Sequence, residues 1–114
     1  MSELATPRSS DRAALARIAL EAALAVGDVV GAEAGPHGTW VTEAGGERLP
    51  GVVAVAQADG RYALDLHLIV RPVPLHELAE RIRERVVRAS ERAGLEGALG
   101  SIGVSIEDIE LLEG

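Results

Sequence analysis

The second half of the chain, residues 62–112, begins with a regular alternation of apolar and polar positions that predicts a strand. Apolar residues occupy every second position from Arg61 to Val70, which is the period of a strand with one buried face. Pro72 and Pro74 end this strand, because proline lacks the N–H group that a central ladder requires.

A helix and a last strand follow. Gly94 ends the helix, whose apolar residues recur every three or four positions: Leu75, Leu78, Ala79, Ile82, Val86, Ala89 and Ala93. The last strand has apolar residues at every second position: Ile102, Val104 and Ile106. The order strand, helix, strand indicates helices packed on a sheet.

A hairpin precedes the helix. Residues 52–56 read as its first strand, and Asp59 and Gly60 are the preferred pair for a two-residue turn. With that turn one apolar face is expected, with Val53 opposite Leu66 and Val55 opposite Leu64, alongside Tyr62, Leu68 and Val70. The other face mixes small, apolar and ionisable side chains: Val52, Ala54, Ala56, Ala63, Asp65, His67 and Ile69. This mixture suggests a contact surface.

The first half of the chain begins with another helix. Its apolar residues have helical spacing and stop before Gly27: Leu15, Ile18, Ala19, Ala22 and Val26. Arg17 and Glu21 are four positions apart and are expected to form a solvated pair. Residues 28–50 are rich in glycine and predict a short strand and loops.

Together these elements predict one domain. Residues 1–10 are expected to form a flexible tail, and residues 11–112 a single α+β domain. We expect a small two-layer sandwich made of an N-terminal helix, an antiparallel hairpin with short extra strands, a long helix and a final strand.

Composition narrows the classes of function. The net charge is −7, from 18 acidic and 11 basic residues, so nucleic acid is an unfavoured partner. The chain has no cysteine, and its aromatic residues are Trp40 and Tyr62, which leaves little for a base-stacking platform. Arg17, Glu21 and Asp28 interrupt the apolar N-terminal run, so direct insertion into a membrane is not expected.

One pair suggests an enzyme. Asp65 and His67 lie two residues apart on one face of a strand, where a carboxylate can orient an imidazole for acid–base chemistry. No local sequence places a nucleophile or second carboxylate beside them, so a surface pair is favoured over a small enzyme that uses Asp65 and His67. The histidines lack the spacing of metal ligands, and we expect no metal or cofactor.

Two features of the long helix and its C-terminal loop suggest anion binding. The helix carries a basic stripe that consists of Arg81, Arg85, Arg88 and Arg92. Glu77–Arg81 and Glu84–Arg88 have the spacing of helical ion pairs, which favours a solvated face over a binding site for an acidic protein or an anionic surface. Gly97 and Gly100 form a Gly-x-x-Gly sequence, so a KH-like RNA-binding module is an alternative, although no basic residue follows Arg92.

The order of motifs resembles the alkaline-shock-protein family of bacterial envelope stress response proteins. The likeness spans roughly residues 11–110 and rests on these segments: Val26-Gly27-Asp28-Val29, Gly51-Val52, the strand 64–70, the helix with Ile82, Val86 and Val87, Gly94-Leu95, and the ending 102–109. Arg71-Pro72 stands where the family typically has Tyr-Gly, and Gly103 where it has Asn.

The resemblance implies a non-enzymatic cytoplasmic scaffold or adaptor that supports the cell envelope under stress. It implies self-association and attachment to the membrane through a small membrane-anchored protein partner. The expected protein-interaction residues lie on the mixed hairpin face or on the basic stripe: Ala54, Ala63, His67, Ile69, Arg81, Arg85, Arg88 and Arg92.

Overall fold

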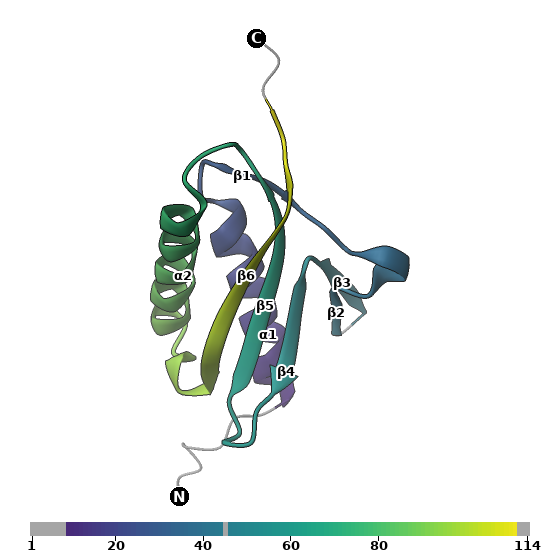
Figure 1. Ribbon diagram of the computed structural model, residues 1–114. Coiled ribbons are helices and arrows are strands. Elements are labelled where there is room, and N and C mark those ends of the chain that lie inside the picture. The colour runs from purple at the N-terminus through teal and green to yellow at the C-terminus, as the bar shows by residue number, and fades with distance from the viewer. Residues whose placement is uncertain (1–8, 45, 112–114) are drawn as a thin grey trace, which may run out of the picture.

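The computed structural model describes residues 9–44 and 46–111, and these residues form an α+β domain as the sequence predicts (Figure 1). The elements in chain order are α1 (Ser9–Leu24), β1 (Val29–Ala32), the 3-10 helix η1 (Pro36–Gly38), β2 (Val41–Ala44), β3 (Glu47–Pro50), β4 (Val52–Ala56), β5 (Tyr62–Val70), α2 (Leu75–Arg92), the 3-10 helix η2 (Glu96–Ala98) and β6 (Leu99–Ile109). The predicted tail falls mostly on residues 1–8, which lie outside the described residues, and α1 already includes Ser9 and Ser10.

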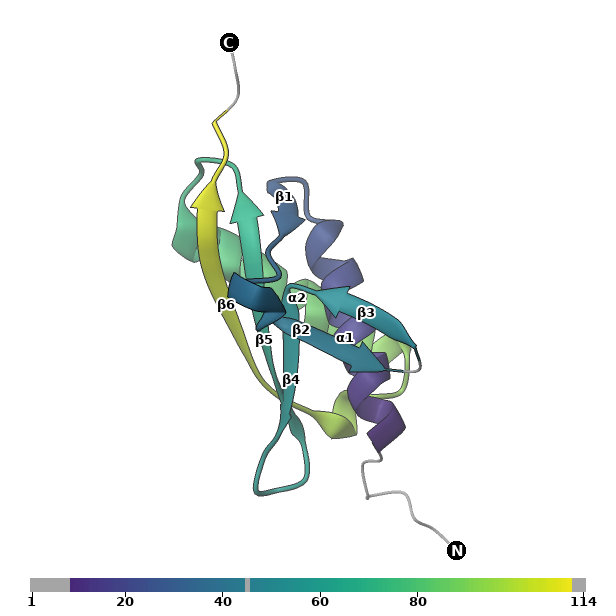
Figure 2. The same cartoon turned by 90° about the vertical axis from the view of Figure 1, so that its right-hand side faces the viewer.

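Strand β5 is the centre of the main sheet. On one edge it pairs antiparallel with two short strands in succession, β4 along residues 62–66 and β1 along residues 68–70. On its other edge it pairs with β6, which runs parallel to it (Figure 2). A parallel neighbour requires a crossover connection, and α2 supplies it. β1 and β4 thus act as two halves of one interrupted strand.

The interruption lies at His67. The N–H of Glu33, just after β1, donates to the His67 carbonyl (2.9 Å), and the N–H of His67 donates to the carbonyl of Gly51, just before β4 (2.8 Å). Between these two points the chain makes an excursion, residues 34–50, that contains η1 and the two-stranded hairpin β2–β3. The buried Thr42 hydroxyl donates to the Val52 carbonyl (2.7 Å) and attaches the excursion to β4. For residues 28–50 the sequence predicted a short strand and loops, and the described part of that range has three short strands, β1, β2 and β3.

Both helices cover the same face of the sheet (Figure 1). The core between the layers is aliphatic, since the chain has no Phe. Its fully buried residues come from all the main elements: Leu15, Ala16, Ala19 and Ala23 of α1; Val52 of β4; Leu64, Leu66, Leu68 and Val70 of β5; Leu78, Ile82 and Val86 of α2. Half-buried Ile102, Val104 and Ile106 of β6 pack against this cluster, as their alternation predicts.

The predicted register of the β4–β5 hairpin is wrong by one residue. The structure pairs Val52 with Leu66 and Ala54 with Leu64, which puts Val52 and Ala54 in the core and leaves Val55 53% exposed. A shift of one residue moves every side chain of a strand to the opposite face.

A longer loop causes this shift. The Gln57 N–H donates to the Arg61 carbonyl (2.7 Å), and the Gly60 N–H donates to the Gln57 carbonyl (3.0 Å), so Gln57 and Arg61 close the hairpin. Gly60 has a φ of 87°, as in hairpins whose turn is followed by a glycine bulge. Ala58 therefore joins Asp59 and Gly60 in the loop, which moves the register by one position.

Candidate functional site

The face of the sheet that points away from the helices is the first candidate site. We call it the open face; from β4, β5 and β6 it carries Val53, Val55, Ala63, Asp65, His67, Ile69, Gly103 and Ser105. Ala63, His67 and Ile69 lie here, as predicted. Ala54 does not: its predicted place on the mixed face is wrong, because the hairpin register turns it into the core, where it is 4% exposed.

At the centre of the open face, His67 is held by two residues from distant parts of the chain. Its Nδ1 lies 2.8 Å from Oε2 of Glu107, and its ring stacks on Trp40 with centroids 4.2 Å apart and an interplanar angle of 3°. The side chains of His67 and Glu107 are 13% and 25% exposed. A carboxylate is only an acceptor, so this contact places a proton on Nδ1 of the imidazole.

The backbone explains how these groups meet. From Leu64 and Ile102 to Leu68 and Ile106, β5 and β6 pair without a shift, and a bulge follows that aligns Ile69 with Asp108. Glu107 is the extra residue of this bulge, and its carboxylate reaches His67. Bulges commonly redirect a side chain in this way.

Trp40 is positioned by the ends of the excursion. Its N–H donates to the Ala34 carbonyl (2.7 Å), and its carbonyl accepts from the N–H of Gly51 (2.7 Å). Because Gly51 also binds the backbone of His67, the indole is fixed over the imidazole. Sequence reasoning missed Trp40 and Glu107, since their contacts depend on pairings between segments far apart in the chain.

The structure does not bring the predicted Asp65–His67 pair into contact. Asp65 is exposed, and the carboxylate that binds His67 is that of Glu107. Ser105 is the cross-strand neighbour of His67, but no hydrogen bond joins its hydroxyl to the imidazole in the described part of the chain. The group is therefore a fixed polar cluster on a sheet surface.

We predict that His67 and Glu107 are energetically coupled by about 1 kcal/mol. A double-mutant cycle of His67→Ala and Glu107→Ala, followed by urea unfolding, measures this coupling. The matched cycle of His67→Ala with Asp65→Ala should give a coupling near zero. A larger coupling for Asp65 than for Glu107 would contradict the observed partner.

Two of the four arginines in the basic stripe of α2 form ion pairs with acidic side chains. Arg81 pairs with Asp28 (3.1 Å) in place of the predicted Glu77, and Arg88 pairs with Glu84 (2.8 Å), as predicted. Arg85 and Arg92 have no ion pair among residues 9–44 and 46–111, and both line a groove between α1 and α2.

On α1, Arg17 pairs with Glu47 of β3, so its predicted pair with Glu21 is wrong.

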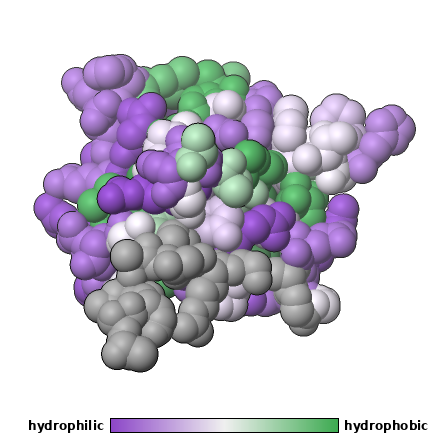
Figure 3. Space-filling model, turned by 90° about the horizontal axis from the view of Figure 1, so that it is seen from below, coloured by the Kyte–Doolittle hydropathy of each residue, from purple (hydrophilic) through white to green (hydrophobic). Residues whose placement is uncertain are grey.

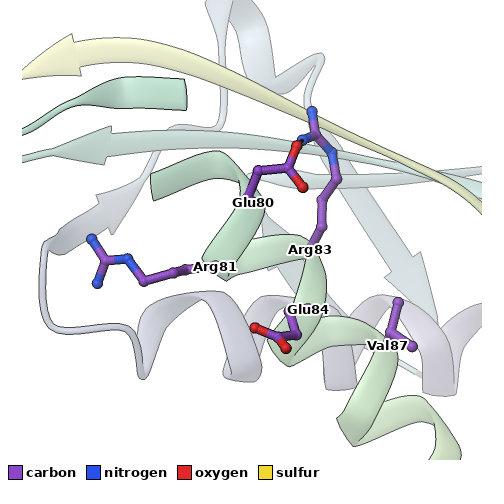
Figure 4. Close-up of a pocket in the computed structure, with 5 residues that line it drawn as sticks. All are labelled: Glu80, Arg81, Arg83, Glu84 and Val87. Carbon is purple, nitrogen blue, oxygen red and sulfur yellow. Dashed lines mark hydrogen bonds and ion pairs between the residues drawn. The ribbon is translucent and has the colours of Figure 1, made fainter. Parts of the chain in front are cut away.

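A second hollow lies along α2 itself. It measures about 540 Å³ and is lined by Glu80, Arg81, Arg83, Glu84 and Val87 (Figure 4). Glu80 turns toward Arg83, which binds it at 2.9 Å and also donates from Nε to the Ile102 carbonyl (3.1 Å). The charged groups of this hollow thus already have partners, so it offers little for a ligand.

The Gly-x-x-Gly segment lies at the C-terminal end of α2. Gly97 is part of η2, and Gly100 is the second residue of β6, where a Cβ would clash with the Gln57 side chain and the Tyr62 carbonyl. Seen from this end of the molecule, hydrophilic side chains surround separate apolar areas (Figure 3). Arg92 ends α2 close to this loop, whereas Arg81 lies about three turns away and binds Asp28, so only one end of the basic stripe lies beside the loop.

Two further features are absent from the described residues. They contain no group of three or more His, Cys, Asp or Glu side chains that could hold a metal ion. None of their helices is long and apolar enough to cross a membrane.

Comparison of the chain with protein-family models, curated proteins and solved structures finds no match. The geometry described above is thus the basis for assigning a function.

Proposed function

We propose that this chain is a non-enzymatic scaffold or adaptor that supports the cell envelope under stress through contacts with other protein chains. The observation that carries this proposal is the outer edge of β6. Within the described ranges β6 pairs only with β5, so its other edge is free for another strand. The role in the envelope comes from the resemblance to alkaline-shock proteins.

The β6 edge has little of the usual protection against pairing beyond one arginine. Residues 99–106 contain no charge and no proline, which are the residues that commonly block edge strands. Arg83 covers the Ile102 carbonyl, and the bulge and acidic residues begin only at Glu107. A free edge of this kind favours strand addition.

The open face extends the same surface. Val55 is 53% exposed, and Ala63 and Ile69 are half-buried on a face that neither helix covers. Attachment at the membrane through a small membrane-anchored protein would use such a surface without inserting this chain into the lipid. Self-association through β6 is the form of scaffolding that the edge supports best.

The RNA-binding and enzymatic alternatives have less support. Two of the four arginines in the basic stripe are neutralised by Asp28 and Glu84, and the net charge of −7 opposes a phosphate backbone. His67 is held by Glu107 and Trp40, and no hydrogen bond in the described residues joins its ring to Asp65 or to a nucleophile.

We expect the purified chain to form oligomers in light scattering as its concentration rises. Ser101→Lys places a charge beside the β6 edge and should shift the mass toward the monomer, because like charges on paired strands repel. Leu24→Lys adds the same charge at the end of α1, in the helix layer, at a side chain that is 43% exposed, and should leave the mass unchanged.

A cellular experiment tests the envelope role. Cells that lack the chain should grow poorly with an antibiotic that attacks the cell wall, and the wild-type chain should restore growth better than the Ser101→Lys variant. A strict monomer at all concentrations, together with normal growth of the deletion strain, would overturn the proposal.

A further inference from the structure

The two helices form a groove on the side of the molecule that faces away from the sheet. α1 and α2 run in opposite directions and pack against each other (Figure 1). The groove measures about 310 Å³ and is lined by Ile18, Glu21, Ala22 and Ala25 of α1 and by Arg85, Ala89 and Arg92 of α2. It is separate from the open face and from the β6 edge.

The floor of the groove is lined mainly by the short side chains of alanine residues. Ala22 and Ala89 are half-buried, and Ala25 is exposed. The distance between packed helix axes depends on the side chains at the contact, and short side chains allow the closest approach. A third helix laid along the groove would therefore contact both α1 and α2.

The charge of the groove comes from two guanidinium groups and one carboxylate, so the groove is positive on balance. Arg85 and Arg92 are exposed and make no ion pair within the described residues, whereas Arg81, Arg83 and Arg88 of the same helix all do. Arg85 and Arg92 are seven residues apart, which is two helical turns or about 10.5 Å. Glu21 also lines the groove, and no salt bridge joins it to either arginine.

We propose that this groove binds a helix of a partner protein that carries two acidic residues seven positions apart, with small or aliphatic residues between them. The acidic residues pair with Arg85 and Arg92, and the residues between them pack on the alanines. The proposal rests on the proposed function and specifies the chemistry of one partner. A nucleic acid or an anionic membrane fits less well, because each presents an extended negative surface to a chain with a net charge of −7, whereas a helix can place two carboxylates at the two arginines alone.

A designed peptide tests this inference. The probe is an alanine- and leucine-rich helix about five turns long with two Glu residues seven positions apart. Its binding to the full chain, followed by fluorescence anisotropy, should weaken at least tenfold in Arg85→Glu and in Arg92→Glu, which corresponds to about 1.4 kcal/mol for each. Arg88→Glu changes the net charge equally but lies outside the groove lining, and it should change the affinity less than about threefold.

A charge exchange provides the second arm. The double variant Arg85→Glu with Arg92→Glu should bind the same peptide with Lys in place of Glu, which the wild-type chain should reject. Equal losses in Arg85→Glu and Arg88→Glu, or no binding of the Glu peptide by the wild-type chain, would overturn the inference. So would an RNA oligonucleotide or phosphatidylglycerol vesicles that bind through Arg85 and Arg92 when the peptide does not.

Failure of this inference can be separated from failure of the proposed function. Arg85 and Arg92 line the groove with α1, whereas Arg83 is the α2 residue that binds the β6 backbone, so variants of Arg85 and Arg92 should keep the oligomer mass of the wild-type chain. Loss of peptide binding with that mass retained supports the assignment of the groove. Absence of peptide binding with oligomers present overturns the groove and leaves the scaffold function standing.

Discussion

Leu66→Ala should lower the free energy of unfolding by about 3 kcal/mol. Leu66 is fully buried in β5, with β4 on one side and β6 on the other, and its side chain faces the helices. Truncation removes its buried methyl groups and leaves a cavity that the surrounding sheet cannot close. Urea unfolding, with the slope of the transition held equal to that of the wild-type chain, measures the change.

Val55→Ala is the matched control for the core of the hairpin. Val55 is 53% exposed, so we expect a change within about 0.5 kcal/mol. The two-residue turn predicted from Asp59 and Gly60 would instead place Val55 in the core. A cost for Val55→Ala close to that for Leu66→Ala would therefore support that turn and contradict the observed register.

Gly51→Ala should have the second large effect, a destabilisation of about 2–4 kcal/mol. Gly51 has a φ of 91°, which other residues adopt at a cost, and an added Cβ would lie 2.3 Å from the Cβ of Ala32 and 3.2 Å from the backbone nitrogen of Glu33. The new methyl group thus separates the two halves of the interrupted strand. In a thermal scan the midpoint should fall by roughly 4 °C for each kcal/mol.

Gly97→Ala is a control with the same chemical change. Gly97 does not have a positive φ, and nothing lies within 4 Å of its added Cβ. Its midpoint should stay within about 2 °C of the wild-type value. A Gly51→Ala variant as stable as Gly97→Ala would show that β1 and β4 do not meet closely at this point.

The elements with strong periodicity could be predicted from the sequence. The boundaries of α2 follow from its apolar spacing between Pro74 and Gly94, and the inward residues of β6 follow from alternation. Local ion pairs were predictable for the same reason: Glu84 and Arg88 are one helical turn apart and do pair. Such features depend on neighbouring residues alone.

The remaining features depend on contacts between distant segments. Asp28 replaces Glu77 as the partner of Arg81 because the end of α1 lies beside the start of α2. Glu107 reaches His67 only because β6 is parallel to β5 and contains a bulge, and neither property has a local signature. The predicted register of the hairpin was wrong by one residue, because Asp59-Gly60 fits both a two-residue turn and a longer loop with Gly60 at a positive φ.

The excursion at His67 gives the fold a defined point at which it can vary. The chain leaves the sheet at Glu33 and re-enters it at Gly51, and both residues bind the backbone of His67. Residues 34–50 can therefore be shortened, lengthened or exchanged for another folded segment while every pairing of β5 is kept. Across related chains, such exchanges would replace Trp40 and its neighbours over a constant β5, and a new segment would need to refill only the buried positions of Thr42 and Leu49.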